Sequence, residues 1–188
     1  MAVVTATEVT VLTNISASAG TITSSGIIPI VQDRIGVILN NWFTTDIWVE
    51  GIVTFNATAR TVVGDFTWTS YGFADGDEVF INGSYRNDGY YDVLTVSGGT
   101  MTLATGESVV AELSGASVYV GMVKWPTDVK YAAAQMVKFD YDDRPKRSSG
   151  LTSRSLGPLS ESYADAGAFG YPNDILNSLS AYRVVSMR

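Results

Sequence analysis

The residues of this sequence that could do chemistry are mainly carboxylates, and they gather at three short places. Residues 75–78 are Asp-Gly-Asp-Glu, residues 87–88 are Asn-Asp, and residues 142–143 are Asp-Asp. Neighbouring carboxylates can bind a calcium ion or serve as the acid pair of a glycosidase. The first two groups lack the closing glutamate of an EF-hand loop, and tight turns commonly use Asp, Asn and Gly. We therefore expect turn residues here, and neither a metal site nor a catalytic site.

Two residue types are absent, and this narrows the chemistry further. The sequence contains no cysteine and no histidine. It therefore has no thiolate metal ligand and no Ser–His or Cys–His dyad. It also lacks histidine as a general base, the role that histidine fills most often. We expect a protein that is not an enzyme and that needs no cofactor.

Two further groups of side chains suit binding better than catalysis. Arg144, Lys146 and Arg147 form a basic cluster that could contact DNA phosphate or an acidic partner, or could simply be solvated. Trp and Tyr side chains could line a sugar-binding face, although core and interface roles are more common for them. The four tryptophans are Trp42, Trp48, Trp68 and Trp125.

Length, composition and charge define the class of protein. The chain has 188 residues, 46% of them hydrophobic, and a net charge of −7. Residues 1–125 carry twelve acids against four bases, whereas residues 126–188 carry seven acids against eight bases. An acidic body disfavours wrapping nucleic acid but suits a passage through which DNA slides without binding.

The sequence also bears on membranes and targeting. It has no apolar run of the roughly 18 residues needed to cross a bilayer. The first residues, MAVVTATEVTVLTN, lack a basic segment followed by a compact apolar core. We expect no membrane partner and no signal peptide, and a location inside the cell or in a particle assembled there.

Two helices are expected before residue 42. Residues 5–13 have Thr5 and Glu8 at the spacing of a capping box, although their Val and Thr content also allows a strand. Residues 14–26 are small and polar and are expected to form a loop. Residues 27–41 have an apolar stripe at helical spacing, which consists of Ile28, Val31, Ile35 and Leu39.

A third helix is expected at residues 125–141. Pro126 and Thr127 suit its start, and Asp128 places negative charge in its first turn. The pattern ends at residues 142–143, just before Pro145. Its apolar face consists of Val129, Ala132, Ala133, Met136 and Val137.

Between these helices the apolar period changes from 3.6 to 2, starting near Trp48. Turn residues separate six alternating segments, which predict a small antiparallel barrel or sandwich. The fold class is therefore α+β: a helical frame (1–51 and 126–144), an inserted β module (52–125), and a C-terminal arm with a docking segment (145–188). The expected strands are 52–57, 59–63, 77–83, 89–96, 100–105 and 117–125.

The last part of the chain is a polar arm, residues 142–170, followed by a short helix at residues 171–185. The arm has too little periodic apolar surface to fold alone, so we expect a partner chain to order it, with a flexible linker as the alternative. Pro172 starts the helix and Asn173 or Asp174 could cap it. It is too short to stand alone and must dock on a partner or on its own domain.

Two parts of the chain resemble known phage proteins. The order of the helices and the closing segment resembles the head–tail connector (adaptor) family of tailed phages. The most specific piece is a Gly-aromatic-Pro start followed by an acidic residue, an aliphatic pair, a leucine and an aromatic-basic pair. In this chain these are Gly170, Tyr171, Pro172, Asp174, Ile175, Leu176, Leu179, Tyr182 and Arg183. Residues 72–104 are similar to a small β module that recurs in phage structural proteins.

The resemblance implies a structural virion protein in the neck, at the head–tail interface, assembled in the host cytoplasm. It implies a homo-oligomeric ring, twelvefold in this family, between the portal protein and a stopper or tail completion protein, with DNA passing through the lumen. The alternative is a virion-associated carbohydrate- or receptor-binding β module. Residues expected to contact the portal or a neighbouring subunit are Leu156, Leu159, Tyr163, Phe169, Tyr171, Pro172, Ile175, Leu176, Leu179, Tyr182 and Arg183.

Overall fold

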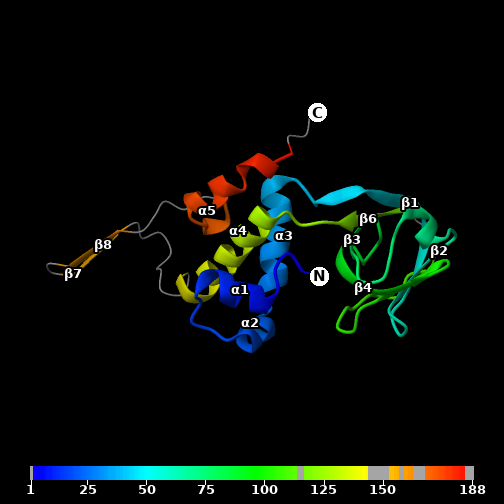
Figure 1. Cartoon of the computed structure of the whole chain (residues 1–188), viewed down its shortest axis with the longest axis horizontal. Coiled ribbons are helices and arrows are strands. Elements are labelled where there is room, and N and C mark those ends of the chain that lie inside the picture. Colours follow the sequence, from blue (N-terminus) through cyan, green and yellow to red (C-terminus); the bar gives the residue numbers. More distant parts are fainter. Residues whose placement is uncertain (1, 114–116, 144–152, 157–158, 163–167, 185–188) are drawn as a thin grey trace. The chain divides into compact units, whose positions relative to one another are not determined.

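A computed structural model describes residues 2–113, 117–143, 153–156, 159–162 and 168–184 (Figure 1). It contains helices and a closed antiparallel barrel, which confirms the predicted α+β class with a barrel between helices. Contacts divide the chain into two compact units. The barrel unit is Met1–Ala2 with Trp42–Lys124, and the helical unit is Val3–Asn41 with Trp125–Arg188.

Helix α1 spans Ala6–Thr13 and begins with the predicted capping box. The Thr5 hydroxyl accepts a hydrogen bond from the Glu8 amide at 3.1 Å, and the Glu8 carboxylate accepts one from the Thr5 amide at 2.7 Å. Each side chain satisfies a backbone donor that a helix start leaves unpaired. The strand alternative for this segment is therefore wrong.

The expected loop at residues 14–26 is also wrong in part, because it contains helix α2, Ala19–Ser25. The Ser18 hydroxyl accepts a hydrogen bond from the Thr21 amide at 3.3 Å, and Gly26 ends the helix in the left-handed conformation at φ 68°. Only Ile22 is buried in this helix. A single buried residue produces no apolar period, so the pattern analysis could not detect this helix.

Helix α3 spans Ile27–Leu39, and the four residues of its predicted stripe are buried. Asn40 ends it in the left-handed conformation at φ 49°, which Asn tolerates better than most residues do. Gln32 is also buried, and its side-chain oxygen accepts a hydrogen bond from the Val3 amide at 3.0 Å. This bond attaches the start of the helical unit to α3.

Helix α4, Thr127–Lys138, lies among α1, α3 and α5 and contacts all three (Figure 1). It continues into a π-helical turn at Phe139–Asp143. All five residues of its predicted apolar face are buried, and Ala134 is buried as well. The short alanine side chains at positions 132–134 allow several helices to approach one backbone closely. Pro126 occupies the N-cap position without a side-chain hydrogen bond.

The C-terminal segment packs within the helical unit of its own chain. It contains a short 3₁₀ turn at Ala168–Gly170, helix α5 at Asn173–Ser178, and a second 3₁₀ turn at Ser180–Tyr182. Pro172 is the N-cap and makes no side-chain hydrogen bond, so the predicted capping by Asn173 or Asp174 is wrong. Tyr171 and Leu179 are fully buried. The segment therefore docks on its own domain, one of the two possibilities left open by the sequence.

The polar arm was expected to have no structure of its own, and this is wrong for one part of it. Strands β7, Ser153–Leu156, and β8, Leu159–Ser162, pair in antiparallel fashion, with Leu156 opposite Leu159. Their high serine content leaves no apolar alternation to detect. Residues 144–152, 157–158 and 163–167 lie outside the described part of the chain.

Within the described ranges, no single helix is long and apolar enough to cross a membrane. The bent pair α2 and α3 passes that test only when the two helices are taken together.

The barrel closes in the strand order β1-β2-β5-β4-β3-β6, which decides between the predicted barrel and sandwich. All six predicted strands are present, but the first begins at Thr44 rather than at residue 52. Residues 44–48 of this strand carry exposed or partly buried side chains that give a weak alternation. The strands are β1 (Thr44–Asn56), β2 (Thr61–Gly64), β3 (Glu78–Asn82), β4 (Gly89–Ser97), β5 (Thr100–Leu103) and β6 (Ser117–Val123).

A tryptophan fills the centre of the barrel core. Trp68 is fully buried, and its indole nitrogen donates to the Gly99 carbonyl at 2.9 Å. Its ring makes edge-on contacts with Phe66 and Phe73. The indole N–H therefore has the partner that a buried polar group requires, while the ring supplies a large apolar area.

Leu179 provides a test of whether the C-terminal segment belongs to the helical core. Because its side chain is fully buried, Leu179→Ala should lower the free energy of unfolding by about 2–5 kcal/mol. Urea unfolding of the full chain measures this. The matched control is Leu113→Ala, since Leu113 is 90% exposed, and its cost should stay below about 0.5 kcal/mol. Equal, small effects of both changes would show that the segment is not part of the core.

Candidate functional site

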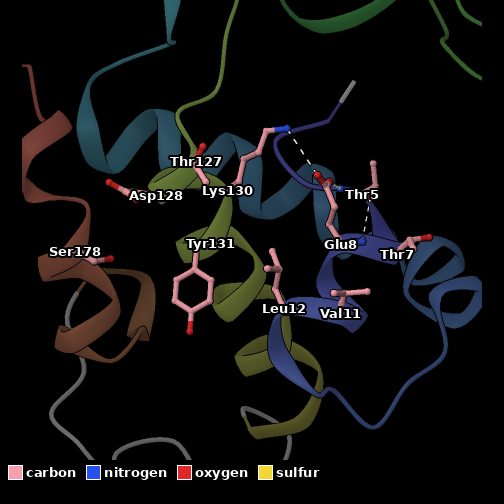
Figure 2. A pocket seen from close by; sticks show the side chains of 10 residues that line it. All are labelled: Thr5, Thr7, Glu8, Val11, Leu12, Thr127, Asp128, Lys130, Tyr131 and Ser178. Carbon is pink, nitrogen blue, oxygen red and sulfur yellow. Dashed lines mark hydrogen bonds and ion pairs between the residues drawn. The ribbon is translucent and has the colours of Figure 1, made fainter.

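The helical unit has an open groove between α1, α4 and α5 (Figure 2). Its volume is about 730 Å³, which is within the range of ligand and peptide sites. Helices α1 and α4 supply most of the lining, and α5 contributes one residue at the rim. The lining residues are Thr5, Thr7, Glu8, Val11, Leu12, Thr127, Asp128, Lys130, Tyr131 and Ser178.

Three apolar side chains of the groove are exposed. Val11 is 77% exposed, and Leu12 and Tyr131 are exposed as well. Figure 2 shows Leu12 on α1 and the Tyr131 ring on α4, with Ser178 across from them on α5. Single exposed apolar residues are normal, but several in one hollow mark an interaction surface.

The polar rim of the groove is well organised. Lys130 Nζ lies 3.8 Å from Glu8 Oε1. The hydrogen bond from the Thr5 backbone amide lowers the pKa of Glu8, with a smaller contribution from Lys130. Asp128 Oδ2 accepts a hydrogen bond from the Tyr182 hydroxyl at 3.3 Å. The rim therefore presents fixed charges of both signs beside an apolar floor, which suits protein recognition better than catalysis.

A buried polar contact connects three parts of the helical unit. Asp140 Oδ2 accepts hydrogen bonds from Arg34 at 2.7 Å and from the Tyr171 hydroxyl at 2.6 Å. Arg34 also donates to the Tyr171 hydroxyl at 2.7 Å, and its guanidinium lies 5.6 Å from the centre of the Tyr171 ring. We call these three residues the Tyr171 network. It joins α3, the π-helical turn and the closing segment.

Burial and the Asp140 carboxylate raise the pKa of Tyr171 to about 12, and Arg34 partly opposes this shift. Both effects favour the neutral phenol, which can donate to Asp140 only while it keeps its proton. At neutral pH the Tyr171 phenol is therefore a structural hydrogen-bond donor.

The acidic residues that could have bound calcium are used as hydrogen-bond acceptors in turns. Asp75 accepts from the Val96 amide at 2.6 Å, and Asp77 accepts from the Ala74 amide at 2.7 Å. Asp88 accepts from the amide of Ser84 at 2.8 Å. Over the ranges that the structure describes, no group of three or more acidic side chains is arranged to hold a metal ion.

The predicted interface residues do not form one surface. Pro172 and Ile175 are buried together with Tyr171 and Leu179 inside the helical unit, so these four cannot serve as a free docking face. Leu176 and Tyr182 are partly buried, while Phe169 and Arg183 are exposed. Leu156 and Leu159 are placed only by their backbone in β7 and β8. Tyr163 and the basic cluster of Arg144, Lys146 and Arg147 lie outside the described residues.

The exposed residues of the groove were not predicted from the sequence. Val11 and Leu12 belong to a helix in which Val9 alone is buried, so they were not recognised as a surplus of apolar residues. Tyr131 follows a charged residue within a helix whose apolar face was assigned without it. One feature of the sequence could have indicated exposed apolar residues here. Residues 5–13 contain more apolar side chains than one buried helix face needs.

The outer face of the barrel carries an exposed pair of aromatic side chains. Trp48 on β1 is half-exposed and stacks on Tyr119 of β6, with ring centres 5.8 Å apart and planes 23° apart. Glu50 is opposite Tyr119 in the strand register, and its carboxylate accepts a hydrogen bond from the Ser117 hydroxyl at 3.3 Å. An aromatic surface beside a polar group is a possible platform for a ring-shaped ligand.

The raised pKa of Tyr171 leads to a pH-dependent stability. The folded unit favours the neutral phenol, so this contribution is complete below the ordinary pKa of 10.0 and is lost as the pH rises to about 12. Two pKa units correspond to about 2–3 kcal/mol. In urea unfolding, the free energy of unfolding should therefore fall more steeply between pH 10.0 and about pH 12 for wild type than for the Tyr171→Phe variant. The two proteins are identical except at residue 171, so parallel curves of stability against pH would contradict the assignment.

Comparisons of this chain with known proteins found little similarity. No protein-family model matches the chain, and no curated protein matches it. Among solved structures, it is similar to the phage phi92 endosialidase with a TM-score of 0.31 and 16% sequence identity. The match covers 40% of this chain and 12% of that one. A likeness at this TM-score supports no conclusion about fold or activity.

Proposed function

We propose that this chain is a structural protein of a tailed-phage particle, a head–tail connector that forms a ring below the portal. The proposal starts from the resemblance of four segments, residues 5–13, 27–41, 127–141 and 170–185, to the connector family. The observation that carries it is that α1, α3, α4 and α5 belong to one packed unit, although the barrel Trp42–Lys124 interrupts them in sequence. Tyr171, from the most specific motif, is fully buried in that unit.

The surface of the helical unit also supports an assembly role. The groove exposes apolar side chains that no other part of the described chain covers. The chain has no histidine or cysteine, and the lining residues contribute no activated nucleophile. An exposed apolar hollow without catalytic groups is suited to holding another protein.

The charge of the chain fits the same role. A net charge of −7 gives a surface that repels phosphate, so DNA could pass through the ring without being held. In this proposal the ring is homo-oligomeric, twelvefold as in the family, and lies in the virion neck between portal and a stopper or tail completion protein. It is assembled in the host cytoplasm.

Ring formation is directly testable with the full chain. Native mass spectrometry and negative-stain electron microscopy should show closed rings, either for the purified protein at high concentration or after mixing with the portal protein encoded in the same phage genome. Portal association is expected because adaptors and portals share one axis. A protein that stays monomeric at every concentration and does not associate with the portal would contradict the connector function.

A second candidate function rests on the exposed Trp48–Tyr119 pair. In this alternative the barrel is a virion-associated module that binds a carbohydrate or a receptor. The flat faces of the two rings would stack on the apolar face of a sugar, and Glu50 could accept hydrogen bonds from its hydroxyl groups.

A glycan array separates this candidate from the connector. If the barrel binds sugar, wild type gives specific signals, and Trp48→Ala lowers the affinity at least tenfold because the stacking surface is removed. Tyr85→Ala is the control, since Tyr85 is an exposed aromatic residue elsewhere on the barrel and its removal should have no effect. An array without signals for wild type would remove this candidate.

A further inference from the structure

The helical unit has a second exposed apolar surface, on α3. Ile30 and Val37 are both exposed, Val37 at 59%, and they lie two helical turns apart on one side of the helix. Asp33 lies between them and is exposed as well. We call these three residues the α3 ridge. It is convex, because it is the outer side of a helix, whereas the groove of α1, α4 and α5 is concave.

A ring has requirements that these two surfaces meet. Subunits in a ring contact each other head to tail, so each subunit needs two different and mutually complementary patches. A two-fold dimer would instead need one patch that complements itself. A helix lying in an apolar groove is a recurrent mode of protein recognition, and residues at i and i+7 are its usual contacts.

We propose that the α3 ridge of one copy binds in the α1–α4–α5 groove of the next copy. Ile30 and Val37 pack against Val11, Leu12 and Tyr131, and Asp33 faces Lys130. This inference rests on the proposed connector function and deepens it by assigning the contact that closes the ring.

One pairing of opposite charges, Asp33 with Lys130, supports this occupant of the groove. Asp33 is exposed and forms no ion pair with any residue in the described part of the chain. Lys130 is the cation at the rim, and its distance of 3.8 Å from Glu8 is near the limit of an ion pair. Asp128 and Glu8 also line the groove, so a carboxylate from a second copy would share Lys130 with Glu8.

The first experiment uses one variant for each surface. Val37→Arg removes the α3 ridge and Val11→Arg removes the groove, and neither change should affect folding because both side chains are highly exposed. Urea unfolding checks that stability is retained. Each variant alone should be unable to form rings. An equimolar mixture should give dimers, because each pair then retains one intact ridge facing one intact groove.

The second experiment exchanges the charges. Asp33→Lys alone should weaken assembly at least tenfold, and Asp33→Lys combined with Lys130→Asp should restore rings, since the ion pair is re-formed with opposite polarity. Ile52→Arg is the matched control, because Ile52 is an exposed apolar residue on the barrel and should leave assembly unchanged. Native mass spectrometry and sedimentation measure all variants.

The outcomes separate the contact from the function. If rings persist in both Val37→Arg and Val11→Arg, the assigned contact is wrong while the connector function stands. If wild type forms open filaments that both variants abolish, the contact is right and the ring function is wrong. A third outcome is that each variant folds and forms no rings, and that their equimolar mixture also stays monomeric. In that case the ridge does not bind the groove.

Discussion

The Tyr171 network holds the helical unit together, and the other features of that unit depend on it. The network joins α3, the end of α4 and the closing segment through two hydrogen bonds to one carboxylate oxygen. Asp140 is nearly buried and Arg34 is partly exposed. Removing one member would leave each of the other two with one hydrogen bond fewer in a largely desolvated place, which costs about 1–3 kcal/mol. The network therefore fixes where the last helix lies, and Leu179 and Ile175 then fill the core beside it.

The barrel can be inserted between α3 and α4 because its first and last strands are neighbours. Strand β1 pairs with β6, with Thr44 opposite Val123, and the Lys124 amide donates to the Phe43 carbonyl at 3.0 Å. The chain thus enters and leaves the barrel at one place. A module whose ends lie close together can interrupt a domain without separating the elements on either side. This explains how α3 and α4 contact each other across an insertion of this length.

The position of α5 also determines which surfaces remain for a partner. Because much of the closing segment packs in the core, its buried residues are unavailable to other proteins. Exposed apolar residues lie on α1, α3 and α4, and Phe169 and Val184 of the closing segment are exposed as well. The helical unit therefore has a concave surface and a convex one. Exposed apolar surfaces of this kind are typical of sites that contact other proteins.

The amino-acid sequence by itself determined the elements that have a strong local period. The helices α3 and α4, the capping box of α1 and all six barrel strands were predictable, because each has repeated apolar residues or characteristic start and turn residues. Helix α2 was not predictable, since Ile22 alone is buried in it. Residues 44–48 of β1 were not predictable either, since none of them is fully buried. Only the tertiary structure decided that the barrel closes, that Tyr171 lies in the core, and that Val11 and Tyr131 remain exposed. These properties depend on contacts between residues distant in sequence, and no local pattern contains that information.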